Sequence, residues 1–160
     1  MDEEYLLDLV IRVIRKVEKR ESAVNYKEVS EPLSFKEVEA AEAKLGFKLP
    51  PLFRMLYTQI GNGGFGPGQG LYPLDDSDPG EESVVKDFLF NKEDTMYVGT
   101  EYEWPEKLLE FCYLHGDDFL CIDCNSEEGP ILLFSDGEIS PRAPSLAAWL
   151  ETWLGSKDKG

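Results

Sequence analysis

The sequence has few basic side chains, one histidine, three cysteines and no long apolar segment. Lys and Arg number 16 against 32 Asp and Glu, which gives a formal net charge of −16 and a pI of about 4.4. Nucleic acid phosphates and anionic membranes are bound by clustered Lys and Arg, so this balance argues against both as partners. No apolar run approaches the ~20 residues of a membrane span, and acids stand where a signal peptide is basic. We therefore expect a cytoplasmic protein.

The scarcity of histidine and cysteine limits the chemistry. One histidine, His115, excludes a multi-histidine metal site, and any Ser-His or Cys-His mechanism would have to use it. Cys121 and Cys124 form C-x-x-C and, with Cys112 and His115, offer four zinc ligands. On a strand, however, positions 121 and 124 point to opposite faces. We therefore predict free thiols, no metal, no cofactor and no catalytic site, and leave open whether these four residues do more than pack.

A glycine-rich segment offers a nucleotide-binding motif that its context contradicts. Gly61, Gly63 and Gly66 match the G-x-G-x-x-G pattern. That fingerprint follows a strand and opens a helix, whereas this segment follows a predicted helix and continues into Pro67. We interpret the glycines as residues that allow positive φ in a turn from helix to strand.

Apolar spacing predicts an amphipathic helix over residues 3–20. Acidic residues lie in its first turn and basic residues in its last, which suits the helix dipole. This order favours a solvated basic face over a membrane-binding or partner-binding one.

Capping signals place the other helices. Ser34 and Glu37 have the spacing of a capping box, and Gly46 is a typical C-terminal stop. Pro50 and Pro51 open a further helix that ends at Gly61. Ser145 caps a last helix whose apolar stripe consists of Leu146, Trp149, Leu150 and Trp153.

Beyond residue 71, short apolar runs separated by turn signals predict a sheet. The clearest strands are residues 108–114, 119–124 and 131–135, joined by turns short enough for hairpins. Residues 81–94 fit neither pattern clearly. The order of helices, sheet and helix predicts a single α+β domain with a mainly antiparallel sheet flanked by helices.

The acidic residues are unevenly distributed. Residues 1–60 hold 11 acidic and 10 basic side chains, whereas residues 61–160 hold 21 and 6. Within that half, residues 75–138 hold 19 acidic and 3 basic side chains. An acidic surface provides solubility, but a field of one sign also attracts a basic partner and speeds association.

Residues 33–64, LSFKEVEAAEAKLGFKLPPLFRMLYTQIGNGG, resemble the signature of the SUKH superfamily. They contain a helix with acidic residues, then Leu45-Gly46 and Leu49-Pro50, a second helix and closing glycines. The second half is similar in Trp104-Pro105, the HGDDFLCIDC hairpin and Gly129-Pro130-Ile131. The resemblance covers residues 30–154, which leaves residues 1–29 as an extra helix and linker and residues 155–160 as a frayed tail.

This resemblance implies an α+β fold, no catalytic residues and a role in protein binding. Many bacterial members are immunity proteins that neutralise cognate toxins, often nucleases, and fungal members include regulators of cell-wall synthesis. We expect an immunity protein whose acidic surface binds a basic toxin domain. The alternative is a non-catalytic regulatory or scaffold module, with an enzyme third. The predicted partner-binding residues are rim acids and two aromatic anchors: Tyr72, Asp75, Asp76, Asp78, Glu101, Glu103, Trp104, Asp117 and Asp118.

Overall fold

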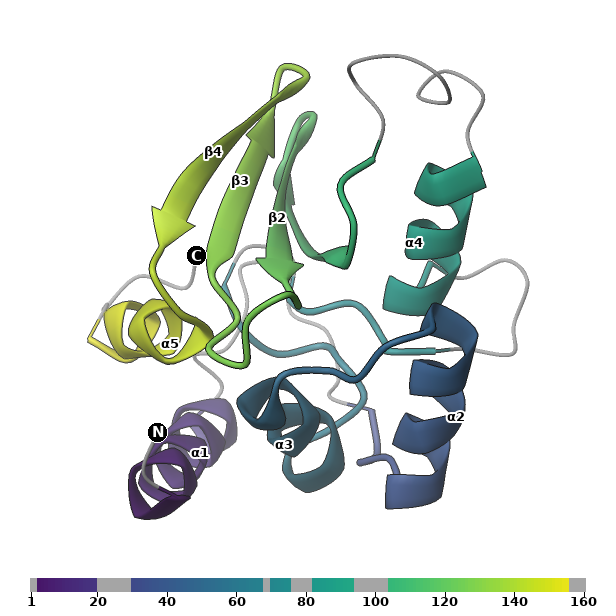
Figure 1. Ribbon diagram of the computed structural model, residues 1–160. Coiled ribbons are helices and arrows are strands. Elements are labelled where there is room, and N and C mark those ends of the chain that lie inside the picture. The colour runs from purple at the N-terminus through teal and green to yellow at the C-terminus, as the bar shows by residue number, and fades with distance from the viewer. Residues whose placement is uncertain (1–2, 20–29, 68–69, 76–81, 94–103, 156–160) are drawn as a thin grey trace.

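The computed structural model describes residues 3–19, 30–67, 70–75, 82–93 and 104–155 (Figure 1). These parts of the chain form five helices and one antiparallel sheet of strand order β1-β2-β3-β4. The elements are α1 (Glu3–Glu18), α2 (Phe35–Leu45), α3 (Pro51–Gln59), α4 (Val84–Glu93), β1 (Leu108–His115), β2 (Asp118–Asp123), β3 (Ile131–Ser135), β4 (Glu138–Ala143) and α5 (Leu146–Leu154). The predicted α+β class is confirmed. No helix in the described ranges is long and apolar enough to cross a membrane.

Capping residues set the helix ends as their spacing predicts. The Ser34 hydroxyl accepts from the Glu37 amide at 3.2 Å, and the Glu37 carboxylate accepts from the Ser34 amide at 3.1 Å. Gly46 closes α2 in the left-handed region at φ 92°. Ser145 accepts from the Ala148 amide at 3.0 Å and starts α5. These bonds satisfy backbone groups that a helix end leaves unpaired.

The core lies between the sheet and the helices α3 and α5. Phe111 of β1 meets Phe53 of α3 edge to face at 5.6 Å and Trp149 of α5 edge to face at 5.3 Å, measured between ring centroids. Phe53 and Phe111 are fully buried, and Trp149 is 7% exposed. These ring contacts hold β1 against α3 and α5.

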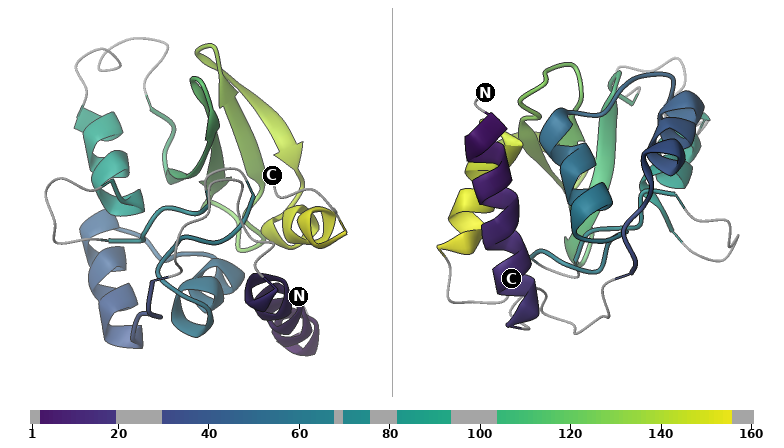
Figure 2. Two further views of the ribbon diagram at one scale, coloured as in Figure 1. Left: turned by 180° about the vertical axis from the view of Figure 1, so that it is seen from behind. Right: turned by 90° about the horizontal axis from the view of Figure 1, so that it is seen from below.

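The helix α1 lies beside α5 and is joined to it by three polar contacts (Figure 2). Tyr5 donates to the Glu151 carboxylate at 3.0 Å, and Arg12 forms an ion pair with the same carboxylate. The hydrogen bond from Arg12 lowers the pKa of Glu151. Lys16 donates to the Trp153 carbonyl at 2.8 Å, which satisfies an acceptor in the last turn of α5. The buried apolar side chains of α1 are Leu6, Leu9, Val10 and Val13.

Two elements differ from the expectation of a sheet beyond residue 71. Residues that the sequence left undecided form α4, whose Val84, Val85 and Phe88 are buried. The strand β4 was not among the predicted strands, because its side chains are exposed at nearly every position and it contains Pro141. Exposed side chains and proline are typical of an edge strand, and β4 lies at an edge of the sheet.

The glycine-rich segment is a turn, as interpreted from the sequence. Gly63 has φ 89°, and a Cβ atom there would lie 2.7 Å from the Leu71 carbonyl oxygen. This close approach holds the following segment against β1, where the Tyr72 amide donates to the Phe111 carbonyl at 2.8 Å. The glycines thereby position Tyr72 beside the sheet.

Candidate functional site

An open groove with a volume of about 750 Å³ lies at the hairpin end of the sheet. Figure 1 shows the two hairpin turns, between β1 and β2 and between β3 and β4, at the end of the sheet away from α1, α3 and α5. Among the residues that the structure describes, the lining includes four acids, four aromatic residues and no basic residue. The lining residues are Tyr72, Glu82, Glu110, Tyr113, Gly116, Asp117, Phe119, Phe134, Asp136 and Gly137. We call this surface the acidic groove.

Strand register brings the aromatic residues of the acidic groove together. Phe119 on β2 pairs with Phe134 on β3, and their rings stack with centroids 4.5 Å apart and planes 9° apart. The two turns next to them contain Gly116 at φ 58° and Gly137 at φ 78°. Asp136, at φ 53°, is one of the residue types that tolerates this left-handed conformation. The turns place acidic side chains around a flat aromatic surface.

A half-buried hydrogen-bonded group forms one wall of the acidic groove. The Tyr72 hydroxyl donates to the Glu110 carboxylate at 2.8 Å, and the Tyr72 carbonyl accepts from Tyr57 at 2.7 Å. Burial raises the pKa of Glu110 to about 7, with further increases from the charges of Asp87 and Glu82. Burial and the charge of Glu82 raise the pKa of Asp87 to about 6. Burial thus disfavours the ionised form of Glu110 relative to an exposed glutamate.

The structure brings two of the nine predicted partner-binding residues into the acidic groove. They are Tyr72, fixed in the wall by its hydrogen bonds, and Asp117, exposed in the turn between β1 and β2. Four others lie outside the described residues: Asp76, Asp78, Glu101 and Glu103.

The remaining three predicted residues make contacts within the protein. Asp75 forms an ion pair with Lys44 of α2 at 2.6 Å. Asp118 accepts from the Ser135 hydroxyl at 2.6 Å, which joins β2 to β3. Trp104 is half-buried and donates through Nε1 to the Leu108 carbonyl at 2.8 Å. None of the three lines the acidic groove.

Sequence reasoning missed most of the groove lining: Glu82, Glu110, Tyr113, Phe119, Phe134 and Asp136. Glu82 entered the sequence analysis only within the count of 19 acidic side chains in residues 75–138. A usable signal was present, because aromatic residues at strand positions next to turns lie near the open end of a hairpin. Strand alternation does not tell which face is covered by helices, so the exposed face had to come from the structure.

The cysteines and the histidine do not gather at a common site. Cys112 and Cys121 are buried, and all three cysteines are free thiols. Burial raises the pKa of Cys112 to about 12 and also raises the pKa values of Cys121 and Cys124, which disfavours reactive thiolates. His115 is exposed at the end of β1. Among the described residues, no group of three metal-ligating side chains could hold an ion.

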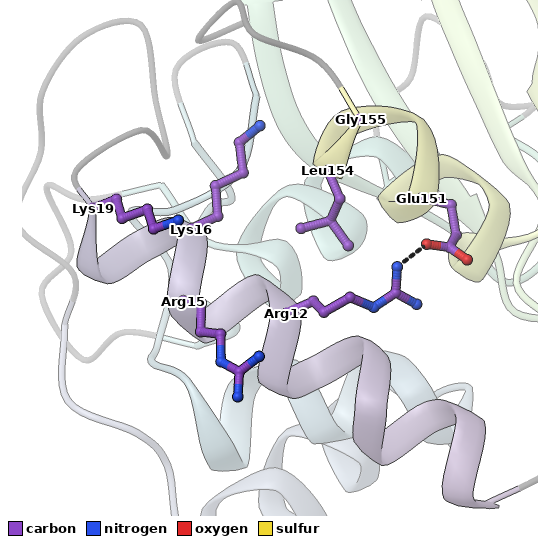
Figure 3. A pocket seen from close by; sticks show the side chains of 7 residues that line it. All are labelled: Arg12, Arg15, Lys16, Lys19, Glu151, Leu154 and Gly155. Carbon is purple, nitrogen blue, oxygen red and sulfur yellow. Dashed lines mark hydrogen bonds and ion pairs between the residues drawn. The ribbon is translucent and has the colours of Figure 1, made fainter.

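A second groove, about 460 Å³ in volume, lies between α1 and α5 and is basic (Figure 3). Arg12, Arg15, Lys16 and Lys19 line it together with Glu151. Arg12 and Lys16 are engaged by α5 through Glu151 and the Trp153 carbonyl, and Figure 3 shows Arg15 pointing away from Arg12. These cations do not converge on a common point, so we interpret this groove as the contact between α1 and α5. The acidic groove is therefore the better candidate for a functional site.

A known protein family matches most of the described residues. A family model described as the SMI1 / KNR4 family (SUKH-1) matches residues 32–152. The match includes the acidic groove and leaves α1 outside. No curated protein matches the chain.

Proposed function

Because the chain belongs to the SMI1/KNR4 family (SUKH-1), we propose that it is an immunity protein that binds and neutralises a cognate toxin domain through the acidic groove. The observation that carries this proposal is a concave surface whose lining, within the described part of the chain, has four acids, four aromatic residues and no base. It acts by binding alone, as the family resemblance implies, and needs neither a catalytic residue nor a cofactor.

Charge complementarity supports a proposal for the class of toxin. A nuclease holds nucleic acid phosphates in a basic groove, so an acidic protein surface competes for that groove. The net charge of −16 also steers a basic domain toward the protein over distances comparable to the Debye length. We therefore propose that the toxin domain is basic and of nuclease type, and that the bound protein blocks its substrate groove.

The aromatic floor of the acidic groove supports the same partner. Arginine side chains stack on aromatic rings and pair with carboxylates, and the groove presents both. Tyr72 and Asp117 belong to this contact surface. The other seven predicted residues remain proposals for its periphery, which extends the contact beyond the groove.

The second candidate is a regulatory or scaffold module, the role of fungal members in the resemblance. Such a module would use the same groove to bind a cellular partner. The gene next to the one that encodes this chain can distinguish the two proposed roles. A large secreted protein with a variable C-terminal domain next to the gene favours immunity, whereas an isolated gene favours the regulator. In both roles we place the protein in the cytoplasm.

Co-expression tests the immunity proposal. The C-terminal domain of the neighbouring gene product is expressed in a bacterial host with or without this chain, and growth and co-purification are measured. We expect the domain alone to stop growth and the chain to restore growth and co-purify with the domain. Toxicity that the chain neither relieves nor binds would contradict the proposal for that pair.

A further inference from the structure

A row of apolar side chains crosses the sheet at its hairpin end. Tyr113 of β1 pairs with Phe119 of β2, Phe119 pairs with Phe134 of β3, and Phe134 pairs with Ile139 of β4. Residues directly opposite one another on neighbouring strands project from the same face of the sheet, so these four side chains are neighbours. None of the four is buried, and Ile139 is 39% exposed. The row therefore gives this face of the sheet an apolar surface that a partner can reach.

The centre of the row is a pair of stacked rings. The ring centroids of Phe119 and Phe134 lie 4.5 Å apart, and the ring planes are 9° apart. Because β2 lies between β1 and β3, the face of the Phe119 ring that does not contact Phe134 is turned toward β1. Tyr72 and Glu110 line the acidic groove on that side, together with Phe119. The groove thus contains an aromatic ring that is supported by its stacked neighbour.

Three exposed carboxylates line the acidic groove around these rings. Asp117 and Asp136 lie in the two hairpin turns, and Glu82 precedes α4. Within the described part of the chain, none of the three forms an ion pair, and no basic side chain lines the groove. These carboxylates attract any cationic side chain, because Coulomb attraction depends on charge and distance and not on the shape of the cation.

The aromatic rings add a requirement of shape. A guanidinium group is planar and weakly hydrated, so it stacks on an aromatic ring while its edge donates hydrogen bonds to a carboxylate. A lysine ammonium group is compact and strongly hydrated, and it pairs with a carboxylate without presenting a plane to the ring. Arginine therefore uses both the rings and the carboxylates of the groove, whereas lysine uses mainly the carboxylates.

We propose that the acidic groove selects arginine over lysine, and that Phe119 with its stacked neighbour Phe134 makes this selection. The inference rests on the proposed function of the groove and names the side chain by which the basic partner is recognised. The guanidinium group lies on the Phe119 ring and pairs with the carboxylates of the groove. The acids set the attraction for cations in general, and the rings set the preference for arginine.

Binding of hexaarginine and hexalysine peptides, which carry equal charge, tests the selection. Isothermal titration calorimetry at one ionic strength gives the Kd of each peptide, and the hexalysine Kd divided by the hexaarginine Kd is the selectivity ratio. We expect a ratio of at least about five for the wild type, since stacking of a cation on an exposed ring contributes a factor of about 2 to 5 per contact. The Tyr113 ring signals in NMR spectra report whether each peptide occupies the groove.

Substitutions in the ring pair separate its effect from the charge of the groove. Phe119→Leu keeps an apolar side chain and removes the aromatic face, so the selectivity ratio should fall by at least about threefold. Phe119→Tyr keeps the ring and should keep the ratio. Phe134→Leu removes the stacked neighbour and should also lower the ratio, so the test does not depend on the folding of one variant. Phe35→Leu is the matched control, because it makes the same change on α2 at a side chain that is 75% exposed and outside the groove lining.

Removal of charge from the groove should have a different effect. Asp117→Asn combined with Asp136→Asn should raise the Kd of both peptides by similar factors and leave the selectivity ratio unchanged. Asparagine tolerates the φ of 53° at position 136, so this variant keeps the turn between β3 and β4.

The outcomes distinguish this inference from the function on which it rests. A selectivity ratio near one for the wild type, or a ratio that Phe119→Leu and Phe134→Leu leave unchanged, would overturn the selection and leave the groove as a surface for cations. Tyr113 ring signals that shift with neither peptide would overturn both the selection and the proposed binding site. An equal fall of the ratio in Phe35→Leu would overturn the assignment of the selection to the ring pair.

Discussion

At the scale of single residues, Gly63 helps to position a side chain of the acidic groove. It has no side chain to contribute, but it lets the backbone of residues 71–73 pass within van der Waals distance. That segment carries Tyr72, whose hydroxyl donates to Glu110 in the groove wall. Backbone geometry at one position thus fixes a side chain of the site.

Substitution of this glycine should be more damaging than substitution of a glycine with the same backbone conformation in open space. Gly46→Ala places a Cβ atom at φ 92° with nothing within 4 Å, so we expect a loss of about 1 kcal/mol in the free energy of unfolding. Gly63→Ala has a similar φ but meets the Leu71 carbonyl oxygen at 2.7 Å, so its loss should be at least about twice as large. Urea denaturation measures both, and equal losses would contradict the close approach.

At the scale of elements, α1 is part of the fold although it lies outside residues 32–152 of the family match. Its Leu9 and Val13 are fully buried in the same hydrophobic cluster as Phe53 and Trp149. An ion pair from Arg12 and a hydrogen bond from Lys16 also connect α1 to α5. The helix should therefore unfold together with the rest of the domain.

Truncation of a buried side chain in α1 tests this cooperation. Leu9→Ala should lower the free energy of unfolding by about 2 to 5 kcal/mol, because it leaves a cavity in the shared core. Leu7→Ala is the matched control, since Leu7 is 41% exposed, and should change stability by less than about 0.5 kcal/mol. Tryptophan fluorescence reports the transition through Trp149 and Trp153. An unchanged midpoint for Leu9→Ala would mean that α1 unfolds independently.

The sequence predicts elements well where a local chemical signal defines them. The capping box at Ser34, the left-handed Gly46 and the cap at Ser145 are confirmed, as are the three strands with strong apolar runs. Val84 to Glu93 and the exposed strand β4 were not assigned, because α4 has a weak apolar period and β4 has no buried face. Local pattern is insufficient where tertiary packing decides the structure.

The acidic character of the candidate site was predictable from the sequence, but only some of its residues were. Charge counting located the acidic excess in the second half of the sequence and contributed Asp117 to the acidic groove, whereas Tyr72 was predicted as an aromatic anchor. Charge counting could not distinguish Asp75, which is paired with Lys44, from an acid that faces a groove. Nor could it find Glu110, because a carboxyl on a strand becomes notable only when burial and Asp87 are known.

At the scale of the whole molecule, the negative charge is unevenly distributed over the surface. The basic side chains of α1 and the acidic groove lie on different parts of the surface, at the α5 side and the hairpin end of the sheet. A basic partner is therefore attracted toward the groove and oriented by the field before contact. Orientation of this kind acts mainly on the association rate and weakens as salt shortens the Debye length.

The association rate of the proposed toxin domain with charge-reversed variants tests the central claim most directly. Glu82→Lys with Asp117→Lys reverses two acids of the groove, and Glu31→Lys with Glu39→Lys reverses two exposed acids at and before α2 with the same change in net charge. At low salt, we predict that the groove variant associates at least about tenfold more slowly than the wild type. The control variant should differ from the wild type by less than about threefold, and the gap between the two variants should narrow at high salt. Equal association rates for both variants would contradict the assignment of the acidic groove as the binding site.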